Sequence, residues 1–336
     1  MTPAISVILP ARDAAATLSC ALDSVRAQTP RDIEILVIDD GSRDATPEIA
    51  RRAARRDARV RLIDGRGRGI VSALNAGIAG ARARYVARMD ADDISLPGRL
   101  GAQRAFLDAR REVGLVGCRV AFGGDPVASR GYALHVAWTN GLLEPDAIGL
   151  HRFIESPFAH PSVMFRRELI ALHGGYRDGR FPEDYELWLR WLEAGVLMAK
   201  VPETLLVWND RADRLSRADP RYSKEAFFRL KAEYLARWLA RHNPRHPEIT
   251  TWGAGRLARR RAEMLLPHGI RIARHADIDP RLVGRFAAGR PVVGPDDIPK
   301  EDFVVAFVAA RGARDLIRAR LQSQGRTLGR DFMLAA

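Results

Sequence analysis

Acidic side chains follow two of the β-branched runs in the first third of the chain. Asp90-Ala91-Asp92-Asp93 comes directly after Val86–Met89, and Asp39-Asp40-Gly41-Ser42 follows Ile35–Ile38. Carboxylate oxygens are the ligands that Mg²⁺ and Mn²⁺ prefer, so the first cluster is a candidate site for a divalent cation. A solvated acidic turn that caps the following helix explains the same residues equally well.

The second acidic turn also has two interpretations. A carboxylate at a strand end can accept a hydrogen bond from a ribose hydroxyl or a base N–H, and Gly41 permits a tight turn. Alternatively, Ser42 or Asp44 caps the next helix. Both roles can hold at once.

A third acidic pair, Glu183-Asp184, opens a predicted amphipathic helix whose apolar face includes Tyr185, Trp188 and Leu192. The helix dipole favours acidic residues in a first turn, which accounts for the pair without any function. A carboxylate in that place can also serve as a general base. Trp188 either belongs to the core or offers a flat aromatic surface to a ligand.

The first part of the chain alternates short apolar runs with helical periodicity. This rhythm predicts a mainly parallel sheet with right-handed crossovers, and ligands bind such sheets at the carboxyl ends of the strands. The predicted strands are Ile5–Leu9, Ile33–Ile38, Val60–Ile63 and Tyr85–Met89, and the predicted helices are Ala14–Ala27, Thr46–Arg56 and Ile70–Ala81. The less regular stretch Val113–Ser216 is expected to complete the same domain.

The alternation of strands and helices resumes near the C-terminus, with helices predicted at Arg256–Leu266 and Arg311–Gln324. We therefore expect three parts: residues 1–220, a helical segment and linker over 221–247, and a small Rossmann-like α/β domain over 248–336. Gly253 and Gly255 follow a strand and open a helix, a layout that suits a nucleotide phosphate. The same glycines can be a packing device in a docking or scaffold module.

Composition limits the class of protein. The chain has 336 residues, 47% of them hydrophobic, and two cysteines, which form neither a metal-ligand pattern nor a disulfide framework. The sequence shows no signal peptide and no apolar run long enough to span a bilayer, so we expect a cytoplasmic protein, with peripheral contact at the inner face of the membrane as an option.

The net charge of +13 admits nucleic acid, an anionic membrane or a polyanionic small molecule as a partner. Only four of the 54 basic residues are Lys, which indicates a bias in base composition. The arginines are spread along the whole chain, so we expect no nucleic-acid partner.

Six motifs in the same order resemble those of glycosyltransferase family 2, over about residues 4–216. They are Ser6–Arg12, Ile38–Thr46, Leu74–Gly77, Met89–Asp93, His160–Met164 with Gly174-Gly175-Tyr176, and Glu183–Trp188. The resemblance implies a GT-A fold, which is α/β with a mixed, mainly parallel sheet. It also implies inverting transfer of a sugar from a nucleotide-diphosphate sugar, with UDP favoured, to a hydroxyl of a glycan or glycolipid acceptor in cell-surface polysaccharide biosynthesis.

The resemblance further implies roles for individual residues. Asp184 would be the catalytic base, with Glu183 beside it, and Asp90 and Asp92 would hold Mn²⁺ or Mg²⁺. His160 and Trp188 would lie on the acceptor side. The residues implied in binding the donor nucleotide are Pro10, Ala11, Arg12, Asp39, Asp40, Gly69, Asn75, Arg88, Asp90, Ala91 and Asp92.

The sequence departs from the family pattern in two places. The Gln-x-x-Arg-Trp element of processive members is only partly matched by Leu187–Trp191, so we expect a non-processive enzyme. Leu206-Val207-Trp208-Asn209-Asp210-Arg211 stands in place of a Tyr-Arg-x-His loop, which leaves open whether Arg211 or Arg214 contacts the diphosphate. A catalytically silent nucleotide-sugar-binding module and a basic nucleic-acid-binding protein remain as alternatives.

Overall fold

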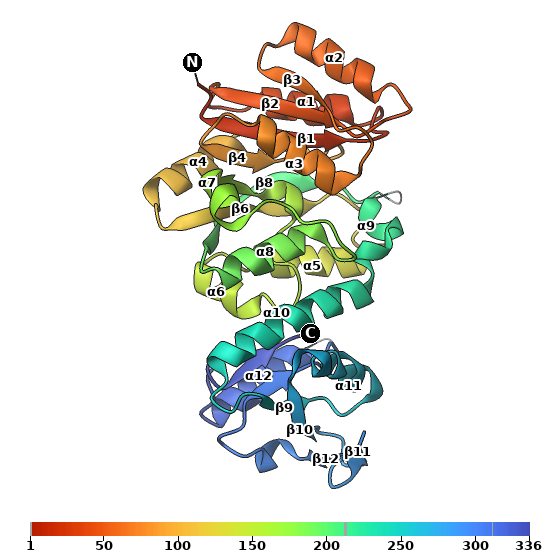
Figure 1. Cartoon of the computed structure of the whole chain (residues 1–336), viewed down its shortest axis with the longest axis vertical. Helices are drawn as coiled ribbons and strands as arrows, with labels where there is room; N and C mark the ends of the chain where they lie inside the picture. The colour runs from red at the N-terminus through yellow and green to blue at the C-terminus, as the bar shows by residue number, and fades with distance from the viewer. Residues whose placement is uncertain (1, 212–213, 311) are drawn as a thin grey trace. The chain divides into compact units, whose positions relative to one another are not determined.

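The computed structural model describes residues 2–211, 214–310 and 312–336. The chain forms two compact units (Figure 1). The N-terminal unit contains Met1–Gly149 and Pro157–Asp219, and the C-terminal unit contains Leu150–Ser156 and Pro220–Ala336. A short segment from the middle of the chain thus belongs to the C-terminal unit, which the sequence did not indicate.

The N-terminal unit is built on a mixed eight-stranded sheet of order β3-β2-β1-β4-β7-β6-β8-β5. Strands β1 to β4 are parallel, β7 is antiparallel to both β4 and β6, and β8 is parallel to β6. The strands are β1 (Ile5–Ala11), β2 (Ile33–Asp39), β3 (Val60–Asp64), β4 (Tyr85–Arg88), β5 (Ile94–Ser95), β6 (Val113–Phe122), β7 (Met164–Arg166) and β8 (Leu197–Trp208).

Helices cover both faces of this sheet, as the continuous apolar run of β1 requires. Val7 and Leu9 point into one core cluster, whereas Ile8 points into the other. The helices are α1 (Leu18–Arg26), α2 (Thr46–Arg56), α3 (Ile70–Gly80), α4 (Arg99–Ala109), α5 (Arg130–Asn140), α6 (Pro145–His151), α7 (Glu168–His173), α8 (Glu183–Glu193) and α9 (Leu215–Ala218).

The first helix begins later than its apolar periodicity predicts. Ala14 donates its N–H to Thr46 Oγ1 at 2.7 Å, and Ala15 donates to Asp44 Oδ2 at 2.9 Å. These amides belong to a loop held by the start of α2, so α1 starts only at Leu18. The prediction that this helix begins at Ala14 was wrong because a distant side chain supplies the hydrogen bonds.

The C-terminal unit has a six-stranded sheet of order β11-β12-β10-β9-β13-β14, in which only β11 is antiparallel to its neighbour. Its strands are β9 (Glu248–Trp252), β10 (Arg271–Ala276), β11 (Phe286–Ala287), β12 (Arg290–Val293), β13 (Val304–Ala306) and β14 (Phe332–Leu334). Its helices are α10 (Lys224–His242), α11 (Arg256–Glu263) and α12 (Ala313–Ser323); Arg311, where the last helix was predicted to begin, lies outside the described residues. None of the described helices combines the length and apolar character needed to cross a bilayer.

Close packing between α3 and the sheet yields a test of the core. A Cβ atom added at Gly77 would lie 2.6 Å from Ile8 Cγ2 and 2.8 Å from Ile38 Cδ1. Because these branched side chains are buried and cannot move aside, we expect Gly77→Ala to lower the free energy of unfolding by about 1–3 kcal/mol. Differential scanning calorimetry of the full chain would show this as a lower transition midpoint.

The matched control is Gly131→Ala in α5, where an added Cβ meets nothing within 4 Å. We expect this change to leave the midpoint unchanged or to raise it, because alanine is the better helix former. Equal effects of the two substitutions would contradict the packing argument.

Candidate functional site

The acidic cluster lies where β4 ends, at the carboxyl edge of the parallel strands. Asp90, Asp92 and Asp93 each offer a carboxylate oxygen, and these oxygens lie within 4.8 Å of one another. Ala91, between them, is almost completely buried. The short turn from β4 into β5 therefore brings three carboxylates together in a partly buried position.

Arg88 keeps Asp90 ionised. The last residue of β4, Arg88 is buried and donates from Nη2 to Asp90 Oδ1 at 2.6 Å. Burial alone would raise the pKa of Asp90, but the positive charges of Arg88 and Arg214 outweigh it and lower that pKa. Arg99 of α4, also buried, donates from Nη2 to the carbonyl oxygen of Arg88 at 2.5 Å and supports the end of the strand.

The other two carboxyl groups have raised pKa values. Burial, followed by the negative charge of Asp90, raises the pKa of Asp92 and raises that of Asp93 strongly. Asp93 Oδ1 accepts the N–H of Asn209 at 2.8 Å, while its buried Oδ2 has no hydrogen-bond partner among the described residues. An oxygen-rich site with excess negative charge and an unsatisfied buried carboxylate oxygen fits a hard divalent cation.

Asn209 fixes this cluster from the end of β8. In addition to its backbone contact with Asp93, its side-chain Nδ2 donates to the carbonyl oxygen of Asp92 at 2.7 Å. The sequence noted Asn209 only as a departure from a family pattern, because nothing local connects it to a cluster 116 positions earlier. The residue positions the carboxylates from the end of the strand that pairs with β5.

Positive charge lies beside the cluster as well. The guanidinium of Arg214 stacks over the ring of Trp208, 4.3 Å from its centroid, and its buried Nη1 has no partner among the described residues. The charges of Arg214 and Arg211 oppose the rise in the pKa of Asp92, which places both close enough to act on it.

The loops that follow β1 and β2 are joined to each other. Arg12 Nη1 lies 3.7 Å from Asp40 Oδ2, and Asp40 Oδ1 accepts the N–H of Gly69 at 3.2 Å. Burial raises the pKa of Asp40. Since Asp40 is almost completely buried and used within the fold, the partly exposed Asp39 is the better placed of the two to meet a ligand.

The remaining residues expected near the nucleotide shape the edge of the sheet mainly with their backbone. Pro10 and Ala11 are buried at the end of β1, in register with Ile38 and Asp39 of β2. Gly69, with φ of 91°, precedes the first residue of α3. These positions shape the edge of the sheet beside Asp39.

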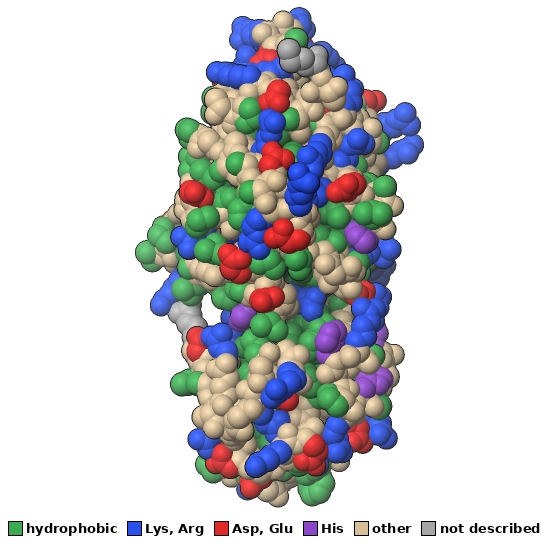
Figure 2. All heavy atoms as spheres, turned by 90° about the vertical axis from the view of Figure 1, so that its left-hand side faces the viewer, with side chains coloured by type: hydrophobic (Ala, Val, Ile, Leu, Met, Phe, Trp, Pro, Cys, Tyr) green, Lys and Arg blue, Asp and Glu red, His purple; other side chains and the backbone are tan. Residues whose placement is uncertain are grey.

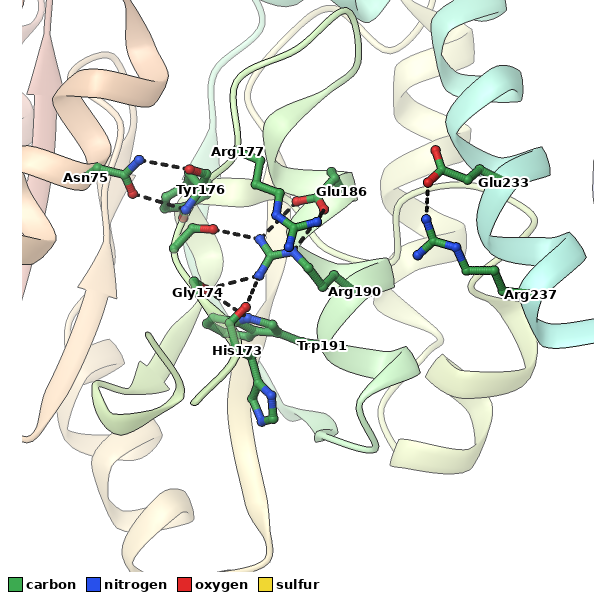
Figure 3. Close-up of polar contacts among 11 residues, drawn as sticks. Asn75, His173, Gly174, Tyr176, Arg177, Glu186, Arg190, Trp191, Glu233 and Arg237 are labelled. Carbon is green, nitrogen blue, oxygen red and sulfur yellow. Dashed lines mark hydrogen bonds and ion pairs between the residues drawn. The ribbon is translucent and has the colours of Figure 1, made fainter. Parts of the chain in front are cut away.

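Asn75 uses its side-chain amide to hold a loop of the fold. Its Nδ2 donates to the carbonyl oxygen of Tyr176 at 2.9 Å, and its Oδ1 accepts the N–H of Tyr176 at 3.1 Å. Figure 3 shows this reciprocal pair. Asn75 therefore holds the loop that carries Tyr176, and the donor contact that the resemblance implied stays a prediction.

A second set of contacts holds the same loop from α8. Arg190 donates to both carboxylate oxygens of Glu186, at 2.9 and 3.0 Å, and to the carbonyl oxygen of Gly175 at 2.6 Å. Trp191 Nε1 donates to the carbonyl oxygen of Gly174 at 3.3 Å (Figure 3). The loop is thus fixed between α3 and α8, which sets the place of Tyr176.

Tyr176 and His160 form a neutral hydrogen-bonded pair. Tyr176 Oη lies 2.7 Å from His160 Nε2, and His160 Nδ1 lies 4.0 Å from Glu183 Oε1. Burial and the charge of Arg88 lower the pKa of His160 far below its usual value, and burial raises the pKa of Tyr176. The sequence singled out His160 but not Tyr176, although the Gly174-Gly175-Tyr176 motif could have indicated it.

Asp184 has the properties of a proton acceptor. It is the second residue of α8, remains partly exposed, and accepts the N–H of Tyr185 at 2.7 Å. Burial, together with the negative charge of Glu183, raises the pKa of Asp184 to about 7. Arg88 acts on the pKa values of both Asp184 and Asp90, so the helix end and the acidic cluster belong to one electrostatic site.

The placement of Trp188 on the acceptor side was wrong. Its side chain is 0% exposed, and its ring packs edge-on against Phe158, His160 and Trp191. The apolar face of α8 is turned into the core, so the ring of Trp188 packs against that of His160 from the core side.

Gly253 and Gly255 belong to the C-terminal unit. A Cβ added at Gly253, whose φ is 116°, would lie 2.6 Å from Ala258 Cβ, so this glycine permits close packing of the loop on α11. Asp277 Oδ2 accepts the N–H of Ala254, between the two glycines, at 2.7 Å. The negative charge of this carboxylate, in the centre of the loop, would repel a phosphate bound there.

Comparison with known proteins identifies the N-terminal part. Residues 6–172 match the family model of Glycosyl transferase family 2. The amylovoran biosynthesis glycosyltransferase AmsE of Erwinia amylovora is 31% identical over 192 residues, which cover 56% of this chain and 69% of AmsE.

Solved structures agree on the fold. The mannosyltransferase PcManGT from Pyrobaculum calidifontis, in complex with GDP-Man and Mn²⁺, is 25% identical with a TM-score of 0.50; the match covers 72% of this chain and 64% of that one, less than two thirds of its length. S. aureus TarS 1-349, in complex with UDP-GlcNAc, has a TM-score of 0.54 at 16% identity. This match covers 70% of the present chain and 73% of the TarS chain. The mixed α/β fold expected from the sequence is confirmed.

Removal of one carboxylate from the acidic cluster tests the cation site. We expect Asp92→Asn to weaken Mn²⁺ binding by about 10-fold or more, because the variant loses one anionic oxygen ligand. Isothermal titration of the protein with MnCl₂ in the presence of a nucleoside diphosphate would measure it.

Asp32→Asn is the matched control, since Asp32 is exposed at the amino end of β2 and pairs with Arg104. Unchanged Mn²⁺ affinity in Asp92→Asn, or an equal loss in the control, would contradict the assignment.

Proposed function

The chain belongs to glycosyltransferase family 2, and we propose that it transfers a sugar, with inversion, from a nucleotide-diphosphate sugar to a hydroxyl group of a glycan or glycolipid. The family makes it a glycosyltransferase; the stereochemistry, the donor and the acceptor are part of the proposal. The observation that carries it is the pairing of an acidic cluster, in which Arg88 keeps Asp90 ionised, with a separate carboxyl group, Asp184, whose pKa is raised to about 7.

The two parts of the site suit the two bond changes of a single displacement. On the acceptor side, Asp184 takes the proton of the attacking hydroxyl as that oxygen bonds to the anomeric carbon. On the donor side, the bond between the anomeric carbon and the diphosphate oxygen breaks, and the electron pair leaves with the diphosphate. Inversion follows because attack and departure occur on opposite faces of the sugar.

Charge at the donor side favours departure of the diphosphate. A divalent cation held by Asp90 and Asp92 would neutralise the leaving group. Arg214, whose buried Nη1 has no partner among the described residues, would add a second positive charge. We therefore propose a role toward the diphosphate for Arg214, although the Tyr-Arg-x-His loop of the family is replaced in this chain.

The nucleotide would lie along the loops after β1 and β2. Asp39 is partly exposed there and can accept a hydrogen bond from ribose or base, while Arg12 and Asp40 hold the two loops together. Solved proteins with this fold carry GDP-Man in one case and UDP-GlcNAc in another. We retain UDP as the expected nucleotide, to be tested by titration with a panel of nucleoside diphosphates.

The relatives also inform the biological setting. AmsE is named for amylovoran biosynthesis, and we propose that this chain likewise serves polysaccharide biosynthesis. Basic and acidic side chains are interspersed on the face drawn in Figure 2, which gives no support there to the nucleic-acid alternative.

Substitution of the proposed base tests the mechanism. We expect Asp184→Asn to lower kcat by about 10³-fold, because the amide cannot accept the proton, while nucleotide and Mn²⁺ affinity remain unchanged. Release of the nucleoside diphosphate in the presence of acceptor would report turnover. The matched control Asp178→Asn changes an exposed carboxylate in the loop before α8 and should retain full activity; normal turnover in Asp184→Asn would exclude this base.

The pH profile supplies an independent test. Asp184 acts only when deprotonated, so kcat/KM should be lost as the pH falls through about 7. Glu183→Gln removes the negative neighbour that helps to raise the pKa of Asp184, so the acidic limb of the profile should move to lower pH. Glu193→Gln, at the opposite end of α8, should leave the limb in place. An unshifted limb in Glu183→Gln would show that another group titrates.

A further inference from the structure

The excess positive charge of this chain is concentrated in one of its two units. Residues 220–336 hold 23 Lys and Arg against 12 Asp and Glu, a net charge of +11 out of the total of +13. Residues 1–219 hold 31 basic and 29 acidic residues, a net charge of only +2. A bias in base composition acts on every part of a gene alike, so it does not explain this division. Charge gathered in one unit indicates an anionic partner for that unit.

Part of this charge lies on elements at the carboxyl edge of the C-terminal sheet. Helix α11 carries four arginines and one acidic residue, Glu263. The loop after β10 carries the exposed Arg281 and Arg285 against Asp277 and Asp279, and Arg281 pairs with Asp279 at 2.8 Å. Gly253 donates its N–H to the carbonyl oxygen of Ala276 at 2.8 Å, so the start of α11 and this loop lie side by side.

Large apolar side chains are exposed on α11, on the loop after β10 and on the outermost strand, β11. Leu257 is 61% exposed, Ile278 is 76% exposed and Phe286 is 75% exposed. Leu257 directly follows the exposed Arg256, and Phe286 directly follows Arg285. Neither arginine makes an ion pair with another residue in the part of the chain that the structure describes. Exposed apolar residues interleaved with free cations are typical of proteins that lie on a bilayer surface.

Two other anionic partners fit this edge less well. A nucleotide phosphate would meet the carboxylate of Asp277, which already accepts the N–H of Ala254 in the glycine loop. A nucleic acid would attract the arginines but would gain nothing from burying Leu257 and Ile278, since its backbone presents only charge and sugar. A bilayer with anionic headgroups uses both the cations and the aliphatic side chains.

We propose that the basic-apolar edge, defined as Arg256, Leu257, Arg260, Ile278, Arg285 and Phe286, docks the C-terminal unit on an anionic lipid bilayer. The arginines contact the headgroups, and the three apolar side chains enter the boundary between headgroups and acyl chains. Electrostatic attraction alone or apolar insertion alone gives weak, reversible binding, and the two together give stable attachment. Docking does not depend on the proposed sugar transfer, because it involves no residue of the donor site.

Sedimentation of the full chain with lipid vesicles tests this proposal. We expect binding to phosphatidylcholine vesicles that contain phosphatidylglycerol and none to phosphatidylcholine alone. Arg256→Glu/Arg285→Glu should weaken binding by about 30-fold or more, since each arginine near the surface contributes to the attraction. Leu257→Ser/Ile278→Ser should weaken it by about 10-fold or more through lost apolar burial.

A charge-matched variant separates docking by this edge from general attraction. Arg271→Glu/Lys300→Glu changes the net charge by the same amount, but these exposed residues lie at the amino ends of β10 and β13. It should retain vesicle binding within about threefold, because charge beyond a Debye length of the bilayer is screened.

Three results would overturn the proposal: no binding to anionic vesicles, equal losses in the two charge variants, or tighter binding to duplex DNA than to vesicles at physiological salt. Mn²⁺ and nucleotide titration of the same variants should be unchanged, which keeps failure of docking distinct from failure of the proposed function.

Discussion

The buried Arg88 and the partly exposed Asp90 form an ion pair at the end of β4, joined at 2.6 Å. A guanidinium removed from water is strongly destabilising unless a carboxylate and other acceptors satisfy it, so the pair constrains the backbone between the two residues. Arg99 reinforces the constraint by donating to the carbonyl oxygen of Arg88. The direction of the turn that follows β4, and with it the location of Asp92 and Asp93, depends on this pair.

The same buried charge divides the carboxyl groups of the site by role. Arg88 lowers the pKa of Asp90, whereas burial and the negative charge of Glu183 raise the pKa of Asp184 to about 7. Groups whose environments push their pKa values apart can act differently at one pH. An ionised Asp90 in a cluster suited to a cation, and a base that exchanges protons near neutrality, thus arise from one kind of side chain.

Contacts between distant segments keep these groups in place. Asn75 binds the backbone of Tyr176, 101 positions away, and Arg190 fixes the same loop from α8. Asn209 supports the acidic cluster from the end of β8. In the C-terminal unit, by contrast, the features we assign to binding lie on the surface. They are the arginines of α11 and the exposed apolar side chains on and near that helix.

The sequence by itself determined the elements whose patterns are local. Helix α2 has its predicted bounds, Thr46–Arg56, and the parallel strands end at the predicted carboxylates, because apolar periodicity and turn residues act over a few positions. Only the tertiary structure decided which polar groups are used up within the fold. Trp188 is enclosed in the core, Asn75 is committed to Tyr176, and Asp40 rather than Asp39 is buried. Burial and hydrogen bonding depend on partners that the chain brings together from far apart, and no local pattern records them.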